Sequence, residues 1–297
     1  MGRVNKINIG ILGGFQNGKS TFVNCLLDDM VARTGGYGLS VTSINTIYKY
    51  GEVQNVSYVS NKNQTSESGL SYFLSCDTYP KETKQITVSL WKPILSNINI
   101  IDTPGFNANE DDTSMATNSL LDIDIAVLII ENKGISKTEL NILSLLKNHH
   151  IPFYVIMNCR DHMGDSWRPR STFNDNIAKK NIEKIHEQGL KPVPILNMEI
   201  WQTNLIWFWF ASEQFLSESE DKQKNYKEDI EFYCSKHKNS QQSIRDFCLR
   251  ESNFLPLRQF FAEDSLWNNF PLTMARWRKV MDSVLTDWEN KIKSYNV

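Results

Sequence analysis

Short apolar runs alternate with segments of helical spacing along the first two thirds of this 297-residue chain. The apolar runs predict strands at 7–12, 44–50, 55–60, 86–91, 97–101, 123–130, 151–157 and 193–196. Segments of helical spacing predict helices at 21–27, 139–147 and 173–188. The polar stretch 61–85 predicts a loop that contains one short helix near 70–74. Strands that alternate with helices are typical of an α/β fold, in which a mostly parallel sheet has helices on both faces.

The pattern from Ile200 onward predicts only helices. The highly charged residues 213–239 predict an exposed helix pair, and 254–261 predicts a further helix. Pro271 begins a final helix with apolar residues three or four positions apart: Met274, Trp277, Met281, Val284, Trp288, Ile292 and Tyr295. This apolar face indicates either packing within the chain or a helical protein partner.

The segment between the first strand and the first helix reads Gly-Gly-Phe-Gln-Asn-Gly-Lys-Ser, which matches the phosphate-binding loop G-x-x-x-x-G-K-[ST]. Glycines let backbone N–H groups curve around phosphates at the N-terminus of a helix. We therefore expect a nucleoside triphosphate to be bound by Gly13, Gly14, Phe15, Gln16, Asn17, Gly18, Lys19, Ser20 and Thr21. Lys19 is expected to reach the β- and γ-phosphates, and the Ser20 hydroxyl is expected to hold Mg²⁺.

A second motif, Asp102-Thr103-Pro104-Gly105, directly follows the predicted strand 97–101. Alone, these residues are good turn formers. Downstream of a phosphate-binding loop, however, the D-x-x-G spacing indicates the other half of the same site. We expect Asp102 to hold Mg²⁺ through water and the Gly105 N–H to contact the γ-phosphate.

A third motif, Asn158-Cys159-Arg160-Asp161, follows the strand 151–157 in the place of the guanine-reading N-K-x-D. A carboxylate at Asp161 accepts hydrogen bonds from groups that guanine has and adenine lacks, so the wrong base leaves polar groups unpaired. We expect Asn158, Arg160 and Asp161 to bind the nucleotide. Cys159 replaces the usual lysine and covers less of the base, and ATP stays an alternative ligand.

Hydrolysis requires groups that orient water and stabilise the charge that develops on the phosphate. Phe106 after the D-x-x-G motif orients nothing, so Gln16 is our candidate within the loop; the alternative is a solvated side chain. A metal-binding switch threonine is expected before the second strand. Thr42 is favoured for this catalytic and metal-binding role, with Thr46 as the alternative.

The composition is that of a soluble globular protein, with 40% hydrophobic and 22% charged residues. A formal net charge of −2 gives no reason to expect a nucleic-acid partner. Five cysteines without a C-x-x-C pair argue against a metal or disulfide framework. We expect a cytoplasmic protein, because no signal peptide is apparent and no apolar run approaches the ~20 residues that span a membrane.

Three segments together resemble the GTPase domain of bacterial dynamin-like proteins: 13–27, 41–51 and 102–106. The resemblance covers residues 7–200 and the helix near 253–262. It implies the fold of a P-loop GTPase, GTP or GDP with Mg²⁺ as ligands, and Thr42 as the switch threonine. Leu196-Asn197-Met198 stands where such proteins carry a Ser-Ala pair that contacts the base after the last strand.

We expect three parts in the chain: a GTPase core at 1–200, a helical insertion at 201–252, and the last G-domain helix with a C-terminal amphipathic helix at 253–297. The expected function is Mg²⁺-dependent GTP hydrolysis in a dynamin-like assembly switch, in which two G domains pair across their nucleotides. The alternative is a GTP-binding regulatory module with negligible hydrolysis that recruits a partner protein. Direct membrane contact stays open.

Overall fold

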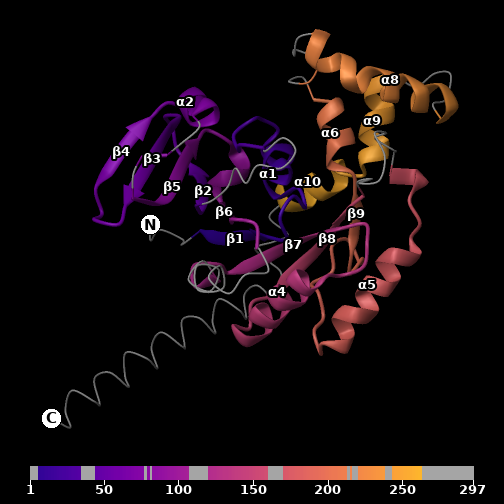
Figure 1. Cartoon of the computed structure of the whole chain (residues 1–297), viewed down its shortest axis with the longest axis horizontal. Coiled ribbons are helices and arrows are strands. Elements are labelled where there is room, and N and C mark those ends of the chain that lie inside the picture. Colours follow the sequence, from indigo (N-terminus) through magenta and orange to yellow (C-terminus); the bar gives the residue numbers. More distant parts are fainter. Residues whose placement is uncertain are drawn as a thin grey trace.

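The computed structural model describes residues 6–34, 44–76, 79–80, 82–106, 120–159, 170–212, 215, 220–237 and 243–262. Within these ranges a nine-stranded sheet has the order β4-β3-β5-β2-β6-β1-β7-β8-β9 (Figure 1). The strands are β1 Ile7–Leu12, β2 Thr46–Tyr50, β3 Asn55–Ser60, β4 Thr65–Ser68, β5 Thr83–Leu90, β6 Ile98–Asp102, β7 Ile125–Glu131, β8 Phe153–Asn158 and β9 Trp201–Thr203. The helices are α1 Lys19–Leu27, α2 Leu70–Ser75, α4 Lys137–Asn148, α5 Asn176–Glu187, α6 Leu205–Phe210, α8 Glu220–His237, α9 Ile244–Ser252 and α10 Leu255–Ala262, with 3-10 turns at Pro93–Ser96 and Arg170–Thr172.

In the run β6-β1-β7-β8-β9 each strand is parallel to the next, whereas β2 is antiparallel to β6 and parallel to β5. The hairpin of β3 and β4 adds an antiparallel edge. This mostly parallel sheet confirms the predicted α/β class.

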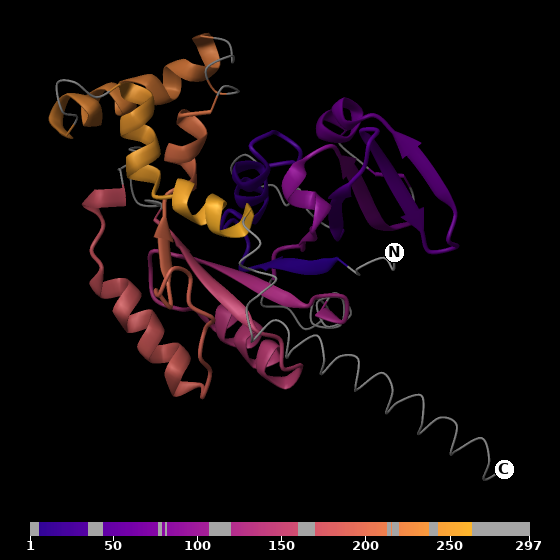
Figure 2. The same cartoon turned by 180° about the vertical axis from the view of Figure 1, so that it is seen from behind.

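Helices cover both faces of the central strands (Figures 1 and 2). On β7, Ile125, Val127 and Ile129 pack in one apolar cluster with residues of α1 and α10. The alternate residues Ala126 and Leu128 belong to a second cluster with residues of α4 and α5. Because successive strand residues point to opposite faces, a strand buried on both sides is apolar throughout. This explains why the continuous apolar runs predicted these strands.

Two strands differ from the prediction. The polar sequence Thr-Ser-Glu-Ser predicts loop, but pairing with β3 makes it the mostly exposed strand β4. The predicted last strand at 193–196 is wrong. Val193 donates one backbone bond to Phe153, but the chain then turns at Leu196, and Trp201–Thr203 forms the last strand, β9, beside β8.

Residues of α6, α8 and α9, after β9, build a third apolar cluster outside the sheet, which we call the helical unit. It contains α6, α8 and α9, and its buried side chains are Trp207, Phe210, Ala211, Phe215, Ile230, Tyr233, Cys234, Phe247 and Cys248. The aromatic helix α6 lies between two cores, since Phe208 packs with the sheet-side cluster and Trp207 with the helical unit. The prediction of a C-terminal helix after Pro271 lies outside the described residues.

Hydrogen bonds join β9 to the junction between α9 and α10. The Thr203 hydroxyl and the Asn204 N–H both donate to the Ser252 carbonyl, at 2.7 and 2.8 Å. The Trp201 indole donates to the Asn253 carbonyl at 2.9 Å, and the Asn253 amide donates to the Gln202 carbonyl at 2.8 Å. The last strand is therefore fixed to the sheet on one side and to the helices on the other.

Candidate nucleotide-binding site

The predicted phosphate-binding loop connects β1 to α1 and requires glycine where it turns most sharply. Gly13 and Gly18 have φ angles of 153° and 95°, in the left-handed region. A Cβ atom at Gly13 would lie 2.5 Å from the Ile129 carbonyl oxygen, and one at Gly18 would lie 2.7 Å from Asn158 Nδ2. Both positions therefore exclude a side chain, because it would be strained and would collide with its surroundings. Gln16 also has a positive φ, 61°, and is exposed.

Lys19, the first residue of α1, is buried beneath the loop that precedes it. Its Nζ donates to the carbonyl oxygens of Gly13 and Gly14 at 3.2 and 2.9 Å. Burial lowers the pKa of Lys19 to about 8, although Asp102 and Glu139 act in the opposite direction. An anion near this ammonium group would replace the water that it has lost, so the position suits a phosphate group.

Ser20 and Asp102 come together where α1 begins and β6 ends. Ser20 Oγ donates to Asp102 Oδ2 at 2.7 Å, whereas the buried Asp102 Oδ1 has no hydrogen-bond partner within the described ranges. Burial raises the pKa of Asp102 to about 6, against the opposing effects of Ser20 and Lys19. A hydroxyl and a carboxylate oxygen are suitable ligands for Mg²⁺, which combines few protein ligands with phosphate oxygens and water. The residues present therefore fit this metal ion.

In the part of the chain that the structure describes, no cluster of three or more His, Cys, Asp or Glu residues forms a metal site by itself.

Gly105 and Phe106, which follow β6, contact the phosphate-binding loop. A Cβ atom at Gly105 would lie 3.0 Å from the Cα of Phe15 and 3.4 Å from Lys19 Nζ. The Phe106 N–H donates to the Gly13 carbonyl at 3.4 Å, and Gly14 and Phe106 form a parallel bridge. The predicted residue Gly105 is thus within contact distance of both the loop and the lysine.

Asn158 at the end of β8 supports the loop from the side of the predicted base-reading motif. Its Nδ2 donates to the Asn17 carbonyl at 3.1 Å, and its Oδ1 accepts from the Leu205 N–H at 3.4 Å. Cys159 is buried, with its Sγ 3.8 Å from the Met157 carbonyl oxygen, and burial raises its pKa to about 12. It therefore packs in the protein interior.

The segment expected after the last strand lies elsewhere. Leu196 and Asn197 form a turn with φ angles of 46° and 71°, which the Ile195 and Met198 backbones close. The residue after β9 is Asn204, next to Leu205, which bonds to Asn158. Leu196-Asn197-Met198 therefore does not follow the last strand of the sheet, because that strand is Trp201–Thr203 and not 193–196.

Among the remaining predicted residues, Thr21 is a half-buried residue of α1. Thr46, the alternative switch threonine, lies on β2 opposite Asp102 in the strand register. Thr42, Arg160 and Asp161 lie outside the described residues. Sequence reasoning missed the contact of Glu139 with Asn17 at 3.0 Å. The spacing Ser136-x-x-Glu139 predicts a helix capping box but no contact with a distant loop.

A glycine-rich loop between a strand and a helix, with a buried lysine and a serine–aspartate pair, defines a P-loop nucleotide-binding domain. Residues 4–206 match the family described as the elongation factor Tu GTP binding domain, and the chain belongs to this family.

The chain is also similar to Dynamin-like protein 2 of Campylobacter jejuni, with 30% identity over 133 residues. The matched part is 43% of this chain and 22% of that relative, so the chain matches about a fifth of the relative's length. This likeness supports the resemblance to dynamin-like GTPases. Two solved structures of an oligomerised bacterial dynamin pair have TM-scores of 0.47 and 0.48, at 18% and 17% identity, with 97% of this chain and 44% of theirs covered. Aquifex aeolicus Era bound to GDP·AlF4 has a TM-score of 0.38 at 17% identity, with 67% of this chain and 51% of that chain covered.

Because burial raises the pKa of Asp102, we expect the stability of the protein without nucleotide to depend on pH. Between its ordinary value of 3.8 and about 6, the folded state binds a proton that the unfolded state releases, so this group lowers stability as pH rises. Asp102→Asn does not titrate. Its free energy of unfolding relative to the parent should therefore increase by about 2–3 kcal/mol between about pH 4 and pH 7. Urea denaturation with EDTA and without nucleotide measures this difference; an equal difference at both pH values would contradict the prediction.

Proposed function

We propose that this chain binds GTP with Mg²⁺, hydrolyses it, and acts as a dynamin-like nucleotide-driven assembly switch. One observation carries the proposal: the buried Lys19 ammonium and the Ser20–Asp102 pair lie together where α1 begins and β6 ends, and Asp102 Oδ1 has no hydrogen-bond partner among the described residues. These groups supply a cation for phosphate and oxygen ligands for a metal ion. Membership of a GTP-binding family supports the nucleotide, and the dynamin-like relative supports the type of switch.

Phosphate binding requires Lys19 to exchange its partners. In the structure its Nζ donates to the carbonyl oxygens of Gly13 and Gly14. A triphosphate would offer charged oxygens in their place, and charge-assisted hydrogen bonds are stronger than bonds to neutral carbonyls. Ser20 and Asp102 would hold Mg²⁺, and this ion, when bound, neutralises charge on the β- and γ-phosphates.

Base recognition is expected next to Asn158, which already supports the loop through Asn17. We propose that Asp161 reads guanine, that Arg160 adds to the binding, and that Thr42 binds Mg²⁺ and the attacking water. Because Cys159 is buried, the side chain at the usual lysine position leaves one face of the base uncovered. Discrimination between guanine and adenine then depends mainly on Asp161.

Hydrolysis by the isolated chain is expected to be slow. Phe106 lies against the loop and has no group that orients water. Gln16 is exposed at the outer turn of the loop and is our candidate for stabilising the γ-phosphate region. We propose that pairing of two G domains across their nucleotides orders Gln16 and accelerates the reaction.

Phosphate release from purified protein tests this proposal. GTP turnover per molecule is expected to rise with protein concentration, and ATP should be a poor competitor. Constant turnover at all concentrations would contradict the assembly switch. Tight GTP binding without phosphate release would instead favour the alternative, a regulatory module that recruits a partner protein.

The described helices include none that is long and apolar enough to cross a membrane. We propose a cytoplasmic protein with guanine nucleotide, a second copy of itself and a helical protein as partners, and without nucleic acid.

A further inference from the structure

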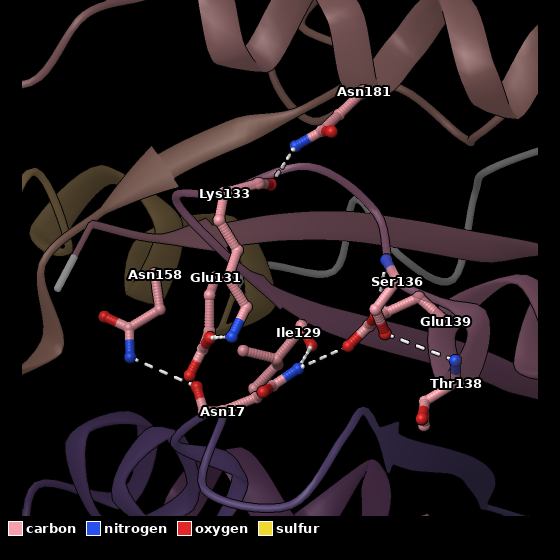
Figure 3. Close-up of polar contacts among 9 residues, drawn as sticks. All are labelled: Asn17, Ile129, Glu131, Lys133, Ser136, Thr138, Glu139, Asn158 and Asn181. Carbon is pink, nitrogen blue, oxygen red and sulfur yellow. Dashed lines mark hydrogen bonds and ion pairs between the residues drawn. The ribbon is translucent and has the colours of Figure 1, made fainter. Parts of the chain in front are cut away.

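The carboxylate of Glu139 connects the phosphate-binding loop to helix α4. One oxygen, Oε1, accepts from the side-chain amide of Asn17 at 3.0 Å. The other, Oε2, accepts from the Ser136 N–H at 2.9 Å and closes the capping box at the start of α4. Figure 3 shows this carboxylate between the loop residue and the helix cap. Both side chains are buried, with 6% of Glu139 and 4% of Asn17 exposed.

Asn17 itself is held by three elements of the fold. Its side-chain amide donates to the Ile129 carbonyl on β7 at 2.9 Å as well as to Glu139 on α4. Its own carbonyl accepts from Asn158 on β8 at 3.1 Å (Figure 3). The residues on either side, Gln16 and Gly18, both have positive φ angles. Asn17 is therefore a fixed point in the most strongly curved part of the loop.

We propose that Asn17 and Glu139 are a pair of positioning residues that hold the loop in its phosphate-binding curve before nucleotide arrives; this inference rests on the proposed function. A loop that is already ordered loses less conformational entropy when it binds its ligand. An asparagine suits the position because its amide has two N–H donors, and the Ile129 carbonyl and Glu139 offer two acceptors.

The charge of Glu139 supports a geometric role for the pair. A negative group near an anion-binding loop opposes phosphate by itself. Gly14 is close to it, since a Cβ atom there would lie 3.0 Å from Glu139 Oε1. The carboxylate lies in the first turn of α4, where the helix dipole favours a negative charge, and the capping box occupies its second oxygen. Apart from its charge effect on Lys19, the contribution of Glu139 to phosphate binding is therefore expected through Asn17.

A double-mutant cycle on nucleotide affinity tests the pair. The variants are Asn17→Ala, Glu139→Ala and the double variant, titrated with a fluorescent GTP analogue and with GDP in the presence of Mg²⁺. Asn17→Ala is expected to weaken both nucleotides about tenfold, and guanosine, measured by competition, less than about twofold. Glu139→Ala, unlike glutamine, leaves no acceptor for the Asn17 amide. It also removes a charge and the α4 cap, but these effects are the same in both backgrounds and cancel in the cycle. With Glu139→Ala present, the loss caused by Asn17→Ala should shrink to less than about threefold.

Asn181→Ala is the matched control. Asn181 is buried, accepts from the Ile135 N–H and donates to the Lys133 carbonyl, both at 3.1 Å, so it supports the same β7–α4 connection without a bond to the loop. It should lower the melting temperature but leave GTP affinity unchanged. Should Asn17→Ala not fold, Asn17→Ser keeps one donor and is expected to show a smaller loss of the same kind.

The outcomes separate this inference from the proposed function. A parent protein that binds no guanine nucleotide would overturn both. If the parent binds GTP, three results would each overturn the pair alone: an unchanged affinity in Asn17→Ala, an equal loss in both backgrounds, or the same loss in Asn181→Ala.

Discussion

Lys19→Ala is expected to lower GTP turnover by about 100- to 1,000-fold, the usual effect of removing one group that stabilises charge in a transition state. Lys19 is buried beneath the loop, and its present partners are the Gly13 and Gly14 carbonyls, which a triphosphate would replace. Phosphate release under saturating GTP and Mg²⁺ measures the change.

The fold of this variant should persist, because burial already disfavours the charged form of Lys19 in the ligand-free protein and lowers its pKa to about 8. Lys147→Ala is the matched control. Its Nζ is exposed and donates to the Gln188 carbonyl, far from the loop, so turnover should not change. If Lys19→Ala keeps turnover within about threefold of the parent, the loop is not the catalytic site.

Trp207→Ala should cost about 3–5 kcal/mol in the free energy of unfolding, as is typical for removal of a large buried aromatic side chain. Trp207 is completely buried in the helical unit and makes edge contacts with Phe210, Tyr233 and Phe247 at centroid distances of 5.5, 6.2 and 5.6 Å. Denaturation followed by circular dichroism measures this loss.

The control for this effect is Trp209→Ala, since Trp209 is only partly buried on the same helix. Its loss of stability should be clearly smaller. Equal losses in the two variants would show that burial of Trp207 does not dominate the helical unit.

The strands that the sequence predicts best are those buried on both faces. β7 has seven consecutive buried residues, and neither a surface helix nor a loop has that pattern. β4 was not predicted, because nothing in Thr-Ser-Glu-Ser distinguishes an edge strand from a polar loop before its partner β3 is known. β9 has only three residues and runs into the aromatic helix α6, so its signal was lost in that of its neighbour.

The nucleotide site also has parts that the sequence predicts and a contact that it does not predict. The spacing of the phosphate-binding loop predicted local geometry, and the position of Asp102 at a strand end was enough to bring it to Ser20, because β6 lies beside β1. The Asn17–Glu139 contact joins residues 122 positions apart in the sequence. Nothing local in either segment indicates it, so the packing of α4 beside the loop had to be known first.

The hydrogen bonds between β9 and the α9–α10 junction have a mechanical consequence. They fasten the helical unit to the sheet at Thr203 and Asn204, and the backbone of Leu205, the next residue, bonds to Asn158. A displacement of these helices would therefore be transmitted through β9 to Asn158, which bonds to Asn17 of the phosphate-binding loop. A force that another molecule applies to the helical unit would thus act on the conformation of the nucleotide-binding loop.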